Sequence, residues 1–249
     1  MVRRLASAGA LLALCGSLAG CASGTSHGGH ARVGRTSTRA HSGAPPTRAQ
    51  AAAFARAVNL TAADVPGFTA TSRHEAETQR EKRLQRRLRE CAGPVHLGDA
   101  LVEQRSASFE LKRAIIDLGV SSEVAVARTA ALAAGELAAI HEQRVRECFS
   151  RYLDMLLEGE RLGGARRGHV SIASGTPPAP GAGGSFGWRI IATFTTDRIK
   201  LSLYVDILGF MLGPARVTLV SSGALRPFPA ELQQRLYTEL LNRAKARSL

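Results

Sequence analysis

The feature that most constrains the fold is a period-two alternation of apolar side chains in the C-terminal half of the chain. Successive side chains of a β-strand point to opposite faces, so the alternation predicts strands with one apolar face each. The positions expected to face inward are Phe186, Trp188, Ile190, Ala192 and Phe194 in the first strand, Ile199, Leu201, Leu203, Val205 and Ile207 in the second, and Val217 and Leu219 in the third. The short turn "TTDR" joins the first two strands into an antiparallel hairpin.

Two earlier segments alternate in the same way. "SASFELKRAII" and "SSEVAVA" predict a pair of strands with Phe109, Leu111, Val124 and Val126 facing inward and a connecting turn between residues 116 and 121. The proline- and glycine-rich "SGTPPAPGAGGS" indicates a flexible loop before the C-terminal strands.

Helical periodicity predicts four helices. They are a short helix over 49–58, a charged helix over "ETQREKRLQRRLREC", a long helix over 129–157 and a final helix from near Pro229. No proline interrupts the long segment, so one continuous helix is expected there. The inward residues are Leu84, Leu88 and Cys91 in the charged helix, Leu137, Ile140, Val145, Cys148, Tyr152 and Leu156 in the long helix, and Leu232, Leu236 and Leu240 in the last.

This order of elements predicts an α+β fold, with a mainly antiparallel sheet packed between helices as in an α/β/α sandwich. The chain has 249 residues, which suits one domain plus appendages. Aromatic residues make up only 5%, so leucine, valine, isoleucine and alanine must fill most of the core. We expect a single extracytoplasmic domain over residues 49–249.

The extracytoplasmic location is predicted from the N-terminus. Arg3 and Arg4 precede an apolar segment over 5–19 that is long enough for a secretory signal but short of the roughly 20 residues that cross a bilayer. The segment ends in "LAGC", residues 18–21, which resembles a bacterial lipobox. We therefore expect a lipoprotein signal peptide over 1–20 and a diacylglyceryl group, with chains such as palmitate, on Cys21. The alternative is an ordinary signal with a chance cysteine.

Residues 21–48 are predicted to form a disordered tether, because they contain almost no large apolar side chain. The "HGGH" segment, with His27 and His30, offers two imidazoles to a metal. No rigid scaffold would orient them, so no metal site is expected. The mature protein is thus expected at the outer face of the cell membrane, held there by its lipid.

The net charge of +13 comes mostly from arginine. Arginine, alanine and glycine are all abundant, which is typical of a GC-rich genome, so the arginines alone do not indicate a nucleic-acid partner. The charge does predict attraction to anionic surfaces such as phospholipid headgroups or acidic envelope polymers.

After the signal and Cys21 are set aside, two cysteines remain. Cys91 and Cys148 occur in similar settings, "RECAGP" and "RECFSR". An even pair in an exported protein most often forms a disulfide, and the absence of C-x-x-C disfavours the alternative of a redox-active thiol.

No hydrolase, zinc-protease or nucleotide-binding motif of the G-x-S-x-G, H-E-x-x-H, P-loop or G-x-G-x-x-G type occurs in the chain. We expect neither catalytic residues nor a cofactor, and His141 is expected to be a packing residue. The candidate ligand-binding residues are Lys200, Tyr204 and Asp206 on the outer face of one strand, and Arg189 on its neighbour. A polar strand face floors a ligand groove only where no helix covers it.

A resemblance adds to this reading. It rests on "LTAADVPGF", Cys91, "SSEVAVA", the segment that carries Cys148 and the strand–strand–helix ending. Together these resemble the extracytoplasmic domains of actinobacterial lipoproteins and the sensor domains of mycobacterial serine/threonine kinases. The resemblance implies a PsbP-like α/β/α sandwich with a ligand cleft. The kinase sensor domains have two disulfides, whereas this chain has cysteines for one, and no catalytic residue carries over.

Three hypotheses for the function follow. The leading one is a non-enzymatic, lipid-anchored envelope protein with a sensor-like domain that binds a small molecule, lipid or glycan. The second is a structural or chaperone-like lipoprotein that acts on acidic polymers through its basic surface. The third is a hydrolase of an unrecognised type.

The lipid on Cys21 can be tested directly. The Cys21→Ala variant is expected to lack acyl mass, because the thiol is the attachment point for the lipid. Intact-mass measurement of the membrane fraction, with the wild type beside the variant, checks this. A mature wild-type protein without acyl mass would contradict the lipid anchor.

Overall fold

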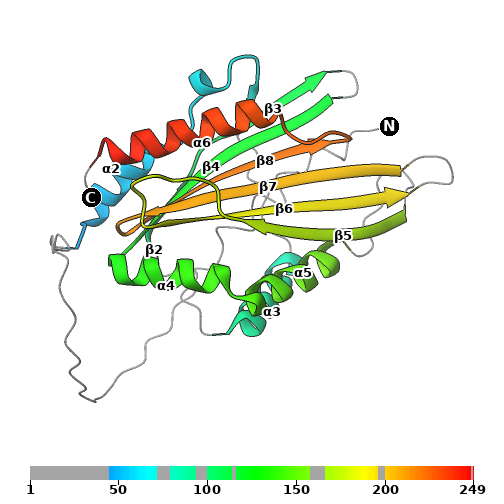
Figure 1. Ribbon diagram of the computed structural model, residues 1–249, viewed down its shortest axis with the longest axis horizontal. Helices are drawn as coiled ribbons and strands as arrows, with labels where there is room; N and C mark the ends of the chain where they lie inside the picture. The colour runs from blue at the N-terminus through cyan, green and yellow to red at the C-terminus, as the bar shows by residue number, and fades with distance from the viewer. Residues whose placement is uncertain are drawn as a thin grey trace.

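The computed structural model describes residues 45–71, 79–93, 100–113, 116–157, 166–195, 200–247 and 249. Eight antiparallel strands form one sheet with helices on both faces (Figure 1). The α+β fold expected from the sequence is therefore confirmed. The predicted signal peptide, Cys21 and the tether up to residue 44 lie outside the described residues, as do Ile199 and the last three residues of the "TTDR" turn, 196–198.

The elements follow one another in this order: α2 (Arg48–Val58), the 3-10 turn η2 (Ala62–Asp64), β1 (Thr69–Thr71), α3 (Gln79–Ala92), β2 (Ala100–Arg105), β3 (Ser108–Arg113), β4 (Ile116–Ala127), α4 (Ala130–His141), α5 (Gln143–Leu157), β5 (Arg166–Gly175), β6 (Gly184–Thr195), β7 (Lys200–Leu212), β8 (Ala215–Ala224) and α6 (Ala230–Lys245). The strand order is β1-β3-β4-β8-β7-β6-β5. β2 and β3 pair with successive parts of the same edge of β4.

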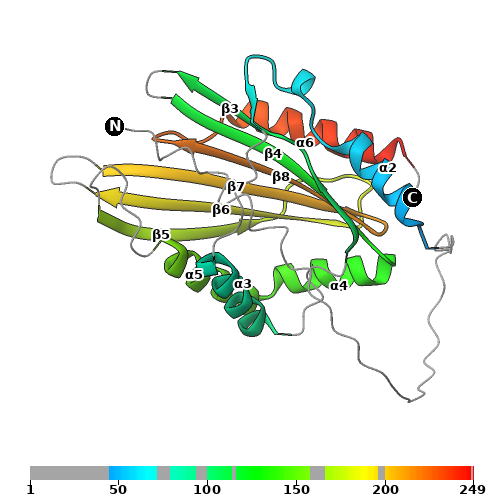
Figure 2. The same cartoon turned by 180° about the vertical axis from the view of Figure 1, so that it is seen from behind.

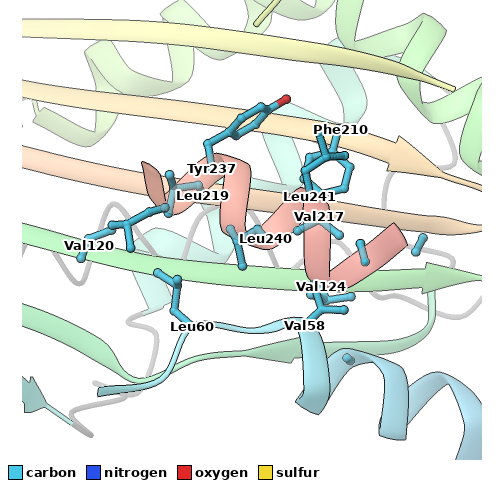
Figure 3. Close-up of a cluster of buried hydrophobic side chains, with 14 of the residues drawn as sticks. Val58, Leu60, Val120, Val124, Phe210, Val217, Leu219, Tyr237, Leu240 and Leu241 are labelled. Atoms are coloured by element: carbon cyan, nitrogen blue, oxygen red, sulfur yellow. The ribbon is translucent and has the colours of Figure 1, made fainter. Parts of the chain in front are cut away.

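The sheet separates two apolar cores. Helices α2 and α6 close one core over β4, β7 and β8, and Figure 3 shows their side chains meeting there. Helices α3, α4 and α5 close the other core over β6 and β7. The predicted alternation is confirmed in β6 and β7, where Phe186, Ile190, Phe194, Val205 and Ile207 all point into the second core.

The predicted long helix over 129–157 is wrong, because the chain forms two helices that meet at Glu142. The backbone of Glu142 is extended, with φ −67° and ψ 136°, and this ends α4. The two helices bury their faces against different supports: α4 packs on strands of the sheet, whereas α5 packs mainly on α3 and β5. The break at Glu142 lets each helix align with the elements on which it packs.

Three strands were missed, and one turn was misplaced. Strands β1, β2 and β5 have too few alternating apolar residues to stand out, and the predicted turn over 116–121 lies within β4. Gly119 and Ser121 are typical of turns. In the structure they lie where β4 packs closely: a Cβ on Gly119 would come within 2.7 Å of Ser222 Oγ. Gly119 therefore allows close packing within the sheet and does not form a turn.

A disulfide joins Cys91, in the last turn of α3, to Cys148 in α5. It is the pairing expected from the sequence. The Arg144 side chain reinforces the same junction by donating from Nε to the Cys91 carbonyl oxygen at 2.9 Å. Within the parts of the chain that the structure describes, no helix has the length and apolar character needed to span a membrane.

Removal of the disulfide is expected to destabilise the domain. The double substitution Cys91→Ala and Cys148→Ala should lower the free energy of unfolding by about 4 kcal/mol at most, because the bridge closes a loop over a sequence separation of 57. Urea unfolding of the oxidised wild type and of the variant measures the difference. The reduced wild type should match the variant, and an unchanged midpoint would contradict the prediction.

Candidate functional site

On the α6 side, one part of the sheet is covered by none of the helices that the structure describes. Helix α6 packs on β7 and β8, and β5 and β6 extend beyond it (Figure 1). We call this region the open sheet face. Its residues, each exposed or half-buried, are Ser171 and Ala173 on β5, Arg189, Ile191 and Thr193 on β6, and Ser202 and Tyr204 on β7.

At the border between the open sheet face and α6 lies a polar network centred on Asp206. Arg189 donates from Nε to Asp206 Oδ1 at 2.6 Å and from Nη2 to Oδ2 at 3.0 Å. Gln233 donates from Nε2 to Asp206 Oδ2 at 3.1 Å and to Ser221 Oγ at 2.6 Å. The Asp206 carboxylate thus accepts three hydrogen bonds from two different elements.

The sheet register builds this network. Arg189 on β6 and Ser221 on β8 lie directly opposite Asp206 on β7, one on each side. Gln233 comes from the first turn of α6, whose N-cap is Pro229. The Asp206 side chain is only 4% exposed and that of Arg189 is 51% exposed. The hydrogen bonds with Asp206 raise the pKa of Arg189 above its usual value, so a permanent cation stands at the surface.

Tyr204 belongs to the same site, whereas Lys200 does not. Tyr204 lies two residues from Asp206 on the same face of β7, opposite Ile191. Lys200 pairs with Thr195 at the other end of the strand, about 20 Å from Asp206. The structure therefore brings together Arg189, Tyr204 and Asp206 and leaves out Lys200. Asp206 is buried and acts as a support for Arg189.

Leu225 borders the open sheet face and was not anticipated. Its φ of 68° is in the left-handed region, which a leucine rarely adopts, and its side chain is largely exposed. The Leu225 N–H donates to the Ser202 carbonyl oxygen at 2.7 Å. The chain then crosses over Gly223, where a Cβ would lie 2.2 Å from the Arg226 oxygen. This crossing forms a rim beside Tyr204.

A second polar cluster lies on the opposite side of the sheet, beneath α4. Glu123 on β4 accepts from Arg105 Nε and from Arg216 Nη2, each at 2.9 Å. Arg216 also donates to Glu136 on α4, and Arg105 donates to Glu103 at 3.3 Å. Three carboxylates and two guanidinium groups are therefore packed against one another, with Glu123, Glu136 and Arg216 buried and Glu103 and Arg105 about a quarter exposed.

This second cluster contains more carboxylates than guanidinium groups, and the pKa values of two of its carboxylates are raised. Burial, together with the nearby charge of Glu123, raises the pKa of Glu103 to about 7. Burial also raises the pKa of Glu136. Arg216 on β8 bonds both Glu136 on α4 and Glu123 on β4, so the second cluster links α4 to the sheet. The sequence signal was a charged residue, Glu123, in the middle of the apolar "SSEVAVA" strand.

The two histidines that the structure describes, His141 and His169, do not form a catalytic group. His141 Nε2 lies 3.1 Å from the Ser185 carbonyl oxygen, but the residue is exposed, so the predicted packing role is wrong; His169 is exposed on β5. His74 and His96 lie outside the described residues. Among the residues that the structure describes, no group of three or more histidine, cysteine, aspartate or glutamate side chains could hold a metal ion.

Comparisons with known proteins found little. No protein-family model matches the chain, and no curated protein sequence matches it. The extracellular domain of PknH from Mycobacterium tuberculosis is similar in structure, with 11% sequence identity and a TM-score of 0.33, over 62% of this chain and 70% of that chain. A similarity this weak supports no conclusion about function, so the function must be argued from the site.

The pKa of Glu103 predicts a specific pH dependence of stability. Folding raises this pKa from 4.5 to about 7, so the folded protein holds a proton that the unfolded chain has lost. The resulting stabilisation is complete below pH 4.5 and is lost as the pH rises through 7. The side chain is 22% exposed, so we discount the effect to on the order of 1 kcal/mol.

The Glu103→Gln variant is expected to lack this decline, because glutamine does not titrate. Urea unfolding of wild type and variant between pH 4.5 and pH 8 measures the difference in free energy of unfolding. The exposed Glu90→Gln serves as the matched control and should decline as the wild type does. A Glu103→Gln variant that also declines as the wild type does would refute the prediction.

Proposed function

We propose that this protein is a non-enzymatic, lipid-anchored envelope protein whose domain binds a glycan on the open sheet face. One observation carries the proposal: Arg189 is half-exposed and is held in a single orientation by the buried Asp206. A guanidinium has five N–H donors, of which these bonds use two. The other three have no partner among the described residues.

The stability of the fold alone does not require this ion pair. A buried carboxylate needs its charge partner, and an apolar pair of the same size is often as stable as a buried ion pair. Here the pair lies at the border of an uncovered surface, and the Arg189 side chain is 51% exposed. A guanidinium fixed in this way loses little conformational freedom when a ligand binds.

The neighbouring side chains favour a polyhydroxylated ligand. Tyr204 on β7 and Ser171 on β5 are diagonal neighbours of Arg189 and provide an aromatic ring and a hydroxyl group, and Ser202 adds a hydroxyl group farther along the open sheet face. Adjacent sugar hydroxyls or a sugar carboxylate can accept the paired N–H donors of a guanidinium, and the ring can cover an apolar sugar face. The net charge of +13 further favours an acidic glycan.

A binding role fits this site better than catalysis does. Arg189 and Gln233 donate to both carboxylate oxygens of Asp206 and hold the side chain in place, so these oxygens are engaged as acceptors. A general base would need a free lone pair directed at a substrate. The lipobox-like "LAGC" and the Cys91–Cys148 disulfide support a place outside the cytosol.

The glycan site can be tested with an array of purified neutral and acidic cell-wall oligosaccharides. The wild type should bind a subset of them, and Arg189→Lys should weaken that binding by roughly 10- to 100-fold, the value of one or two charge-assisted hydrogen bonds. Lysine keeps a cation beside Asp206, so the fold is preserved while the planar donor group is lost. Tyr204→Ala should also weaken binding.

Arg113→Lys is the matched control, because Arg113 is exposed at the end of β3, away from the open sheet face. It should bind as the wild type does. If Arg189→Lys and Tyr204→Ala both retain wild-type binding, or if no oligosaccharide binds, the proposed glycan site is refuted.

A further inference from the structure

Helix α3 carries a row of cations that the fold does not use. Lys82, Arg83 and Arg86 are exposed and Arg89 is half-exposed, and we call these four residues the basic face of α3. Residues three and four apart lie on the same side of a helix, so Lys82, Arg86 and Arg89 form one continuous row.

The position of α3 makes this face accessible. The helix packs on α5, with Leu84 directed into the core, and it lies outside α5 at the surface of the molecule (Figure 2). Two other exposed arginines contact α5: Arg80 donates to the Met155 carbonyl oxygen at 2.8 Å, and Arg87 donates to Met155 Sδ at 3.8 Å. The inward side of the helix is thus satisfied by α5, and the basic face is directed away from it.

The basic face differs from the arginines that stabilise the domain. Arg105, Arg189, Arg216 and Arg243 each form an ion pair with an aspartate or glutamate. In contrast, no residue of the basic face has an acidic partner within the described parts of the chain. The four cations outnumber the one exposed carboxylate that the structure describes beside them, Glu90, so the approach of a surface of opposite charge lowers the free energy of this face.

We propose that the basic face of α3 docks on the anionic headgroups of a phospholipid bilayer. The exposed side chains are long and charged and include no large apolar group, so the helix lies on the headgroups without insertion. The disulfide at Cys91 fixes the end of α3 to α5, which keeps the row rigid as it meets a flat surface.

The arrangement also agrees with the proposed lipid anchor. The chain between Cys21 and Thr47 can span at most about 90 Å, so a lipid on Cys21 would keep the domain within reach of the bilayer. Helix α3 lies on the side of the sheet opposite α6, whereas the open sheet face lies on the α6 side. Docking through α3 therefore turns the open sheet face away from the membrane.

The test uses the chain from residue 21 to 249 with Cys21→Ser, so that no acyl chain contributes and the result does not depend on the lipid anchor or on the glycan site. Both apolar cores lie between Ala51 and Ala244, so this chain keeps them whole. The probes are vesicles of phosphatidylcholine alone and vesicles that also contain phosphatidylglycerol. Sedimentation with the vesicles measures the affinity.

The chain should bind the phosphatidylglycerol vesicles and not the neutral ones, and 1 M salt, where screening acts over about 3 Å, should release it. The triple variant Lys82→Gln, Arg83→Gln and Arg86→Gln should bind about 100-fold more weakly, at about a factor of five for each charge. The control Arg56→Gln, Arg113→Gln and Arg226→Gln removes the same charge from exposed positions outside α3 and should stay within a few-fold of the wild type.

Circular dichroism and the mass of the oxidised protein check that both variants fold with their disulfide. Equal loss in the two variants would assign the binding to overall charge and overturn the proposal. Wild-type affinity in the α3 variant would overturn it as well. The proposal would also be overturned if the wild-type chain did not bind the anionic vesicles, including the case in which it bound only a soluble acidic polymer.

Discussion

The structure depends on the complete burial of β8. Every residue from Ala215 to Gly223 is buried, because the strand lies between β4 and β7 with helices over both faces. Five of these nine residues are polar or glycine, and buried polar side chains need partners. Arg216 forms ion pairs with Glu123 and Glu136 on one face of the sheet, and Ser221 accepts a hydrogen bond from Gln233 on the other face. The polar residues of β8 therefore fix where α4 and α6 sit on the sheet.

The open sheet face follows from the dimensions of the layers. Seven strands in line span about 30 Å, since neighbouring strands lie about 4.8 Å apart. Helices α2 and α6 pack side by side and cover about 20 Å, at about 10 Å for each helix. On the other side, three helices are available and α5 reaches β5. Two helices cannot cover the whole sheet, so on the α6 side β5 and β6 are covered by no described helix. The Asp206–Arg189 ion pair lies at the border of this uncovered region.

The sequence predicted those features that depend on local periodicity, and it failed on those that depend on tertiary context. The alternation in β6 and β7 identified their inward residues, and the four-residue spacing between Thr195 and Lys200 sets Arg189 opposite Asp206. That pairing was within reach of a register count. The break at Glu142 was not, because it arises from two different packing surfaces. The link from Asp206 to Gln233 also depends on how α6 crosses the sheet, which no local pattern encodes.

The two groups of charged residues that face solvent have opposite physical characters, and this separates their roles. Arg189 is neutralised in part by a buried carboxylate, so its attraction for any anion is short-ranged and depends on hydrogen-bond geometry. The basic face of α3 has no such partner within the described residues, so its attraction is long-ranged, weakly directional and sensitive to salt. The first character suits recognition of one ligand, and the second suits orientation on an extended surface. Because the sheet lies between them, a domain oriented through α3 would leave Arg189 exposed on the far side.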